Sequence, residues 1–144
     1  MSFVRVWIHC IWGTKNRSPF LNNDNKKIII NHIKENAKQK GIFIGTINGD
    51  KDHIHCLISL KPDENLSKTI QLIKGESSFW INKNGLFKYK FEWADEYFAI
   101  SVSESQLDKV KNYIKNQEEH HKKKTWTQEY EEFISVYHFN NIVG

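Results

Sequence analysis

The chain has few of the residues that crosslink or interrupt a backbone. Its 144 residues include two cysteines, two prolines and seven glycines. No apolar run approaches the roughly 20 residues needed to cross a bilayer. Two cysteines are too few for the disulfide framework of a small secreted domain, so Cys10 and Cys56 are predicted to be reduced thiols. The N-terminal residues also lack the charged, apolar and small-residue regions of a signal peptide. These absences favour a cytoplasmic protein with no membrane contact.

Aromatic and basic residues are plentiful. Aromatics make up 13% of the chain, and 21 Lys and Arg residues against 17 Asp and Glu give a formal net charge of +4. Single-stranded nucleic acid fits this composition, because bases stack on aromatic rings and phosphates pair with cations. A modest basic excess also occurs in proteins that bind no polyanion. With no repeat and no long linker, residues 1–144 are predicted to form one domain that ends in a short tail, 125–144.

The order of the expected elements predicts an α+β fold. Alternating apolar residues indicate strands, and apolar residues at helical spacing indicate helices. We expect strands at 3–12, 42–48, 53–60 and 97–102, helices from near 22–24 to about 40, at about 66–82 and about 104–123, and a short helix at 128–133. This β-α-β-β-α-β order, followed by a helix, is that of a ferredoxin-like sandwich: an antiparallel four-stranded sheet with helices on one face.

Two histidines one residue apart mark the third expected strand. Side chains alternate between the faces of a strand, so His53 and His55 point the same way and Ile54 points the other way. Two neutral imidazoles on one face can hold a divalent cation. Alternatively, they are polar positions on a half-buried strand. Asp52 either orients one of these histidines or caps the turn. His9, on the first strand, is predicted to be a packed or hydrogen-bonded histidine.

The last long helix is expected to carry its functional residues beside its buried stripe. Ser103 and Gln106 have the spacing of a capping box that would open this helix. Leu107, Val110 and Ile114 form the apolar stripe. Tyr113 and Gln117 are four residues apart and therefore share one side of the helix, at the edge of that stripe.

Three basic residues and one aromatic segment are candidate nucleic-acid contacts. Lys15 and Arg17 lie in a polar loop, and Lys74 lies on the second helix. Each is predicted either to contact phosphate or to be solvated. Residues 84–94 alternate charged residues with four aromatics, Phe87, Tyr89, Phe91 and Trp93. Such a stripe is either core or subunit interface, or a platform on which bases stack.

Five segments of the chain carry residues that, taken together, have the order and spacing of one known protein family. The segments are 9–12 with Thr14, Lys15 and Arg17; 52–58; 72–78; Trp93 with Tyr97 and Phe98; and 113–117. With these residues the chain resembles the single-tyrosine HUH transposases of bacterial and archaeal insertion sequences, the IS200-like transposase family. HUH denotes histidine, bulky hydrophobe, histidine, here His53-Ile54-His55. The resemblance covers most of the chain.

The resemblance implies a role for each of these residues. His53 and His55, with the side-chain oxygen of Gln117, would hold one divalent metal ion. Tyr113 would attack a phosphodiester in single-stranded DNA, staying joined to the 5′ phosphate and freeing a 3′ hydroxyl. A metal would offset the weak nucleophilicity of a phenol, whose ordinary pKa is about 10. Imidazoles suit zinc and other transition ions, whereas an amide oxygen and phosphate suit Mg²⁺ or Mn²⁺, which the family favours.

The family also implies partners and leaves rival interpretations. Its members act on DNA hairpins at transposon ends and are homodimers in which one chain's tyrosine can serve the other chain's metal site. One rival is a non-catalytic ferredoxin-like module that binds nucleic acid. Others are a replication initiator or relaxase, which the short chain argues against, and a domesticated relative acting on chromosomal repeats. Unlike many relatives, the chain has no glycine between Gly85 and Gly144.

Overall fold

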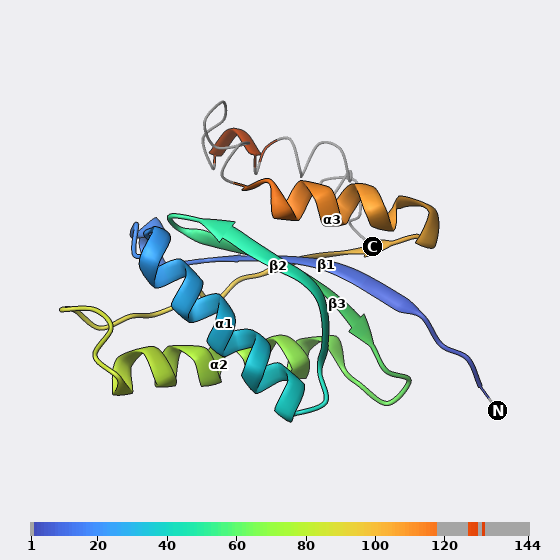
Figure 1. Cartoon of the computed structure of the whole chain (residues 1–144), viewed down its shortest axis with the longest axis horizontal. Coiled ribbons are helices and arrows are strands. Elements are labelled where there is room, and N and C mark those ends of the chain that lie inside the picture. The colour runs from blue at the N-terminus through green and yellow to red at the C-terminus, as the bar shows by residue number, and fades with distance from the viewer. Residues whose placement is uncertain (1, 118–126, 130, 132–144) are drawn as a thin grey trace.

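The computed structural model describes residues 2–117, 127–129 and 131 (Figure 1). Its strands are β1 (Val6–Gly13), β2 (Phe43–Asp50), β3 (His53–Leu60) and β4 (Phe98–Val102). Its helices are α1 (Asn23–Gln39), α2 (Leu66–Lys83) and α3 (Leu107–Lys115), with 3-10 turns η1 (Lys15–Arg17) and η2 (Glu104–Gln106). The predicted β-α-β-β-α-β order, followed by a helix, is confirmed.

The four strands form one antiparallel sheet in the order β2-β3-β1-β4. The strand with the two histidines is therefore central, paired on both sides. Helices α1 and α2 lie against one face of the sheet, and α3 lies against the other (Figure 1). The chain thus has the predicted ferredoxin-like sandwich plus a further helix on the opposite face. Among the described residues, no helix has both the length and the apolar character to cross a bilayer.

Alternation along the central strands separates two apolar clusters. Trp12 and Ile54 point toward α1 and α2 and belong to the larger cluster. Trp7 and Leu57 point to the other face, where they pack with Ile114 of α3 in a smaller cluster. Because one residue step changes the face, the same strand supplies the main core on one side and the site on the other.

The two cysteines lie in the larger cluster, as free thiols, directly opposite each other. Cys10 pairs with Cys56 in the β1–β3 register, and both side chains are fully buried. Burial raises the pKa of the Cys10 thiol to about 12 and raises the pKa of Cys56 well above its ordinary value. The prediction of two reduced thiols is confirmed, and their raised pKa values make them poor nucleophiles.

Two predicted features differ from the structure, the start of β1 and the capping box before α3. β1 begins at Val6, not at residue 3, because Val6 already pairs with Leu60, the last residue of β3. The predicted capping box is wrong: the Ser103 hydroxyl bonds to Ser105, and residues 104–106 form a 3-10 turn before α3 begins at Leu107. The rest of the predicted helix, 118–123, lies outside the described residues. Residues 127–129 and 131 are helical, at the short helix predicted for 128–133, whose residues 130, 132 and 133 also lie outside the described residues.

The aromatic segment 84–94 is mainly core. Phe91 and Trp93 are buried, and the Asn82 side chain bonds both the backbone N–H and the backbone carbonyl of Phe91. Phe20 packs against Phe87 and Phe91. Tyr89 is 72% exposed, so it does not share this environment. The segment is not a strand, because its one ladder contact is an isolated bridge between Trp93 and Thr14.

Candidate active site

His53 and His55 lie side by side on the α3 face of the sheet. Both side chains are fully buried, and their ring centroids are 5.1 Å apart. Close packing of the β2–β3 hairpin fixes their backbone. At Gly49 an added Cβ would come within 2.2 Å of the His53 carbonyl oxygen, so only glycine fits there. The paired strands on both sides leave the two imidazoles little freedom to separate.

Each imidazole is held at Nδ1 by a different neighbour. Asp52 Oδ1 lies 2.8 Å from Nδ1 of His53, and Nε2 of His9 lies 2.9 Å from Nδ1 of His55. Second partners of this kind fix ring orientation in metal sites. With both Nδ1 atoms engaged, the Nε2 atoms are the nitrogens that face α3 and Glu129.

The two Nδ1 arrangements differ electrostatically. For His53, burial disfavours the charged form, but the hydrogen bonds and negative charges of Asp52 and Glu129 outweigh it and raise the pKa. For His9, burial and the neighbouring His55 lower the pKa to about 3, with Glu129 opposing the shift. His9 is therefore a neutral imidazole at physiological pH.

Glu129 brings a carboxylate to both Nε2 atoms. Its Oε2 lies 3.4 Å from Nε2 of His53 and its Oε1 lies 3.1 Å from Nε2 of His55. One ligand atom from each of these three residues lies within 4.8 Å of the other two, and all three residues are buried. Two nitrogens and a carboxylate at this spacing can hold a divalent cation. Sequence reasoning missed Glu129, because nothing in its spacing connects it to two histidines more than 70 residues earlier.

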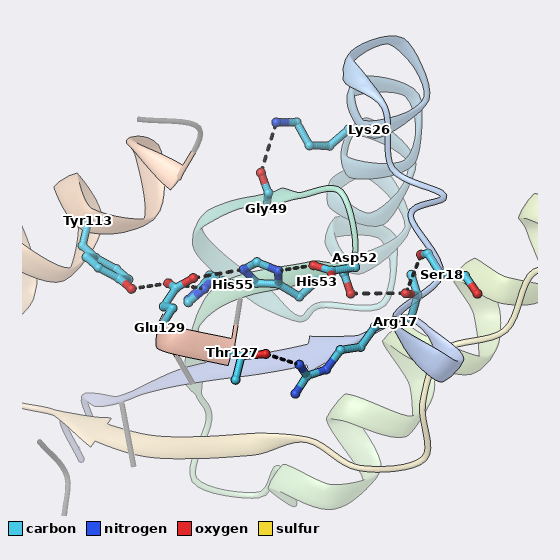
Figure 2. Close-up of polar contacts among 11 residues, drawn as sticks. Arg17, Ser18, Lys26, Gly49, Asp52, His53, His55, Tyr113, Thr127 and Glu129 are labelled. Carbon is cyan, nitrogen blue, oxygen red and sulfur yellow. Dashed lines mark hydrogen bonds and ion pairs between the residues drawn. The ribbon is translucent and has the colours of Figure 1, made fainter. Parts of the chain in front are cut away.

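Tyr113 reaches the same carboxylate from α3. Its hydroxyl donates a hydrogen bond to Oε1 of Glu129, and its ring makes an edge contact with His55 at 5.6 Å between centroids. Figure 2 shows these groups in a row from α3 to the turn before β3: Tyr113, Glu129, His55, His53 and Asp52. The structure thus brings together the predicted nucleophile, both predicted histidine ligands and Asp52.

Gln117 lies one helical turn beyond Tyr113 and is fully buried. Its amide Nε2 donates to the backbone carbonyl of Tyr113 at 3.3 Å, while its Oε1 has no hydrogen-bond partner among the described residues. A buried carbonyl oxygen without a partner is costly, and a cation would satisfy it. The Asn48 side chain anchors this end of α3 by donating to the backbone carbonyl of Lys115 at 2.9 Å.

Comparison with known families decides the identity of the chain. The sequence model described as "Transposase IS200 like" matches residues 2–117, most of the chain. The chain belongs to the IS200-like transposase family. The match takes in both histidines, Tyr113 and Gln117, and it ends before Glu129.

Two relatives of this transposase are similar over most of their lengths. The transposase for insertion sequence element IS200 of Salmonella typhimurium is 24% identical over 119 residues, covering 79% of this chain and 78% of that protein. The ISDra2 transposase TnpA of Deinococcus radiodurans is 25% identical over 115 residues, covering 76% and 81%. Both alignments therefore span about four-fifths of each protein.

Two solved structures share the fold of the transposase. A crystal structure of a Deinococcus radiodurans R1 protein assigned as a transposase has a TM-score of 0.66 at 22% identity, covering 81% of this chain and 93% of that one. The REP-associated tyrosine transposase, solved bound to a REP hairpin, has a TM-score of 0.63 at 14% identity, covering 84% and 72%. At identities of 22% and 14%, the structural similarity supports the assignment of the fold.

The three basic residues predicted to contact nucleic acid lie in different surroundings in the transposase. Arg17 donates to the Thr127 hydroxyl at 2.9 Å and lies beside the site (Figure 2). Lys15 pairs with Glu92 at 3.2 Å on the surface. Lys74 lies on α2, across the sheet from α3, where its ammonium donates to the backbone carbonyls of residues 94–96 at 2.6, 3.2 and 3.4 Å. Burial lowers the pKa of Lys74, and Asp95 opposes the shift. Of the three, Arg17 is the one that the structure places at the site.

Proposed function

We propose that this transposase cuts and rejoins single-stranded DNA at hairpin-bearing ends through a covalent 5′-phosphotyrosine at Tyr113. One observation carries the proposal: the Tyr113 hydroxyl and the Nε2 atoms of His53 and His55 converge on one buried carboxylate, that of Glu129. A nucleophile beside a set of metal ligands is the arrangement that phosphodiester transfer requires. The hairpin in the structure of the REP-associated relative agrees with such a substrate.

The donor set fits one divalent ion, for which we propose Mg²⁺ or Mn²⁺. His53 and His55 would supply Nε2 atoms, and Gln117 and Glu129 would supply oxygens. Imidazole alone favours transition ions, whereas amide and carboxylate oxygens favour Mg²⁺ and Mn²⁺. Such an ion would polarise a non-bridging phosphate oxygen and reduce the charge that opposes nucleophilic attack.

The chain's own groups account for the transfer. The Tyr113 oxygen attacks phosphorus and the bond from phosphorus to the 3′ oxygen breaks. The departing 3′ oxygen takes up a proton from solvent, so the DNA leaves with a free 3′ hydroxyl. Glu129, which accepts the phenol's hydrogen bond, is placed to receive its proton. Because the phosphodiester is exchanged for a phosphotyrosine and is not hydrolysed, a 3′ hydroxyl can reverse the step without ATP. With one such tyrosine per chain and two ends to cut, we propose that a homodimer acts, possessing two sites.

A cleavage assay tests this function. Labelled single-stranded hairpin DNA from the flanks of the gene is incubated with the protein and Mg²⁺ or Mn²⁺. We expect a protein–DNA adduct on a denaturing gel, absent with EDTA and absent for the duplex form of the sequence, with mass spectrometry placing the nucleotide on Tyr113. Tight DNA binding with no adduct in either metal would identify a non-catalytic nucleic-acid-binding module instead.

Replacing Glu129 is expected to weaken metal binding, because its charged carboxylate lies beside both histidines. Glu129→Gln keeps the size of the side chain but removes the charge that faces both Nε2 atoms. Loss of residues that only orient metal ligands costs about 10–100-fold in affinity, so losing a direct carboxylate ligand should weaken Mn²⁺ binding at least about tenfold. Isothermal titration calorimetry measures the effect. Glu131→Gln is the matched control, since Glu131 is exposed two residues away and its loss should leave affinity unchanged. Equal affinities for the two variants would remove Glu129 from the ligand set.

A further inference from the structure

We propose that His9 is a positioning residue for the metal site: it holds Nδ1 of His55 so that Nε2 of His55 is presented to the ion. This inference rests on the proposed function, because it concerns the same ion. His9 itself is not offered as a ligand. Its role is to act through the ring of His55.

The register of β1 and β3 creates this contact. His9 pairs with Leu57, two residues from His55 on the same face, so the two histidines are diagonal neighbours. Their rings have centroids 5.1 Å apart and planes inclined by 35°, which brings Nε2 of His9 to 2.9 Å from Nδ1 of His55. His9 is 2% exposed and His55 is fully buried, so bulk water has little access to take over the bond.

The location of one proton explains why this bond matters. A neutral imidazole carries its proton on one nitrogen and a lone pair on the other. To bind a cation through Nε2, His55 must carry its proton on Nδ1 and donate it. His9 must then accept through Nε2 and carry its own proton on Nδ1. The ion-binding form of His55 therefore depends on an acceptor at the place that His9 occupies.

The hydrogen bond between His9 and His55 can also run in the opposite direction, from His9 to His55. An ionised carboxylate in the place of His9 could only accept. When Nε2 of His55 carries the proton, it donates to Glu129 across the 3.1 Å contact, and Nδ1 must then accept a hydrogen bond. His9 can supply that bond by donating from its own Nε2. Asp52, in contrast, can only accept from His53 while it is ionised, and so fixes one tautomer. His9 thus keeps His55 oriented whether Nε2 of His55 faces a cation or the Glu129 carboxylate.

Two variants that replace His9 with an amide side chain distinguish a positioning role of His9 from a role in packing alone. The terminal atoms of a glutamine extend about as far as Nε2 of a histidine, whereas those of an asparagine extend about as far as Nδ1. His9→Gln can therefore accept from His55 or donate to it, and His9→Asn cannot reach it, although both offer the same chemical group. The ring of His9 also contacts Tyr113, at 6.3 Å between centroids, and both variants lose that contact equally.

Calorimetric titration with Mn²⁺, on wild type and both variants, tests the inference. We expect His9→Gln to bind close to wild-type affinity and His9→Asn to bind about 10–100-fold more weakly, the usual loss when the partner of a ligating histidine is removed. Thermal melting without metal shows whether each variant folds, and His9→Leu replaces His9→Asn if the latter does not. Wild-type affinity in a folded His9→Asn or His9→Leu variant overturns the inference.

The same titration separates this inference from the function on which it rests. If wild type binds no Mn²⁺, the proposed metal site fails and the role of His9 fails with it. If wild type binds Mn²⁺ and the His9 variants bind equally well, only the role of His9 fails. A second test needs no variant: long-range proton–nitrogen NMR of Mg²⁺-loaded wild type determines which ring nitrogen of each histidine carries the proton. Nδ1-protonated tautomers on His55 and His9 support the inference, and an Nε2-protonated tautomer on either overturns it.

Discussion

Phenylalanine in place of Tyr113 is expected to abolish the covalent adduct and to slow strand cleavage by at least about a thousandfold, because the attacking oxygen is gone. The ring contacts with His55 and His9 involve the aromatic face and edge, which phenylalanine retains. Mn²⁺ affinity and DNA affinity should therefore change little. Single-turnover cleavage rates on the hairpin substrate measure the loss, and the melting temperature confirms that the variant is folded.

Tyr89→Phe is the matched control for this experiment. Tyr89 is 72% exposed, outside the site, so the same loss of a hydroxyl there should leave cleavage at the wild-type rate. Cleavage by Tyr113→Phe at the wild-type rate, with an adduct still present, would mean that another residue is the nucleophile. Loss of cleavage in both variants would indicate a general effect of losing hydroxyl groups.

Alanine at His53 and His55 together is expected to remove metal binding at the site and metal-dependent cleavage with it. Both imidazoles are fully buried, and their Nε2 atoms supply the nitrogen ligands of the proposed set. Removing a partner of such a histidine already costs about 10–100-fold in affinity, so removing both histidines should cost at least about a hundredfold. Calorimetry with Mn²⁺ and the adduct assay measure the two losses separately.

His32→Gln is the control for the double variant. His32 bonds Glu76 and stacks on Trp80 between α1 and α2, away from the site, so its loss should affect stability and spare Mn²⁺ affinity. The double variant must also be shown to fold without metal, by its melting temperature and its near-ultraviolet circular dichroism. Unchanged Mn²⁺ affinity in a folded double variant would place the ion elsewhere on the protein.

Local periodicity explains why much of the fold and part of the candidate site could be predicted. The alternation of β3 places His53 and His55 on one face whatever the tertiary structure. Helical spacing likewise puts Tyr113 and Gln117 on one side of their helix. The element order restricts the sheet to few topologies. Pairing of β3 on both sides then follows from its central place in a ferredoxin-like sheet.

Contacts between distant segments could not be predicted in this way. The contact of His9 with His55 depends on the β1–β3 register, and the Arg17–Thr127 bond joins residues 110 positions apart. Glu129 occurs in the C-terminal tail, where no spacing distinguishes it from its acidic neighbours Glu131 and Glu132. The failed capping box has a local cause. The Ser103 hydroxyl forms a hydrogen bond with the nearby Ser105 hydroxyl and makes no capping bond to the helix backbone. Sequence patterns describe which faces residues share, but not which distant faces meet.

The alternation in β3 also restricts which insertions and deletions this chain can accept. One residue added or lost between His53 and Leu60 would shift the register of every residue beyond it and turn those side chains to the opposite face. A change just before His55 would direct that imidazole into the apolar layer under α1 and α2. Lengthening the exposed segment around Tyr89 alters no strand register. Length variation among descendants of this gene should therefore accumulate in that segment and be nearly absent from β3.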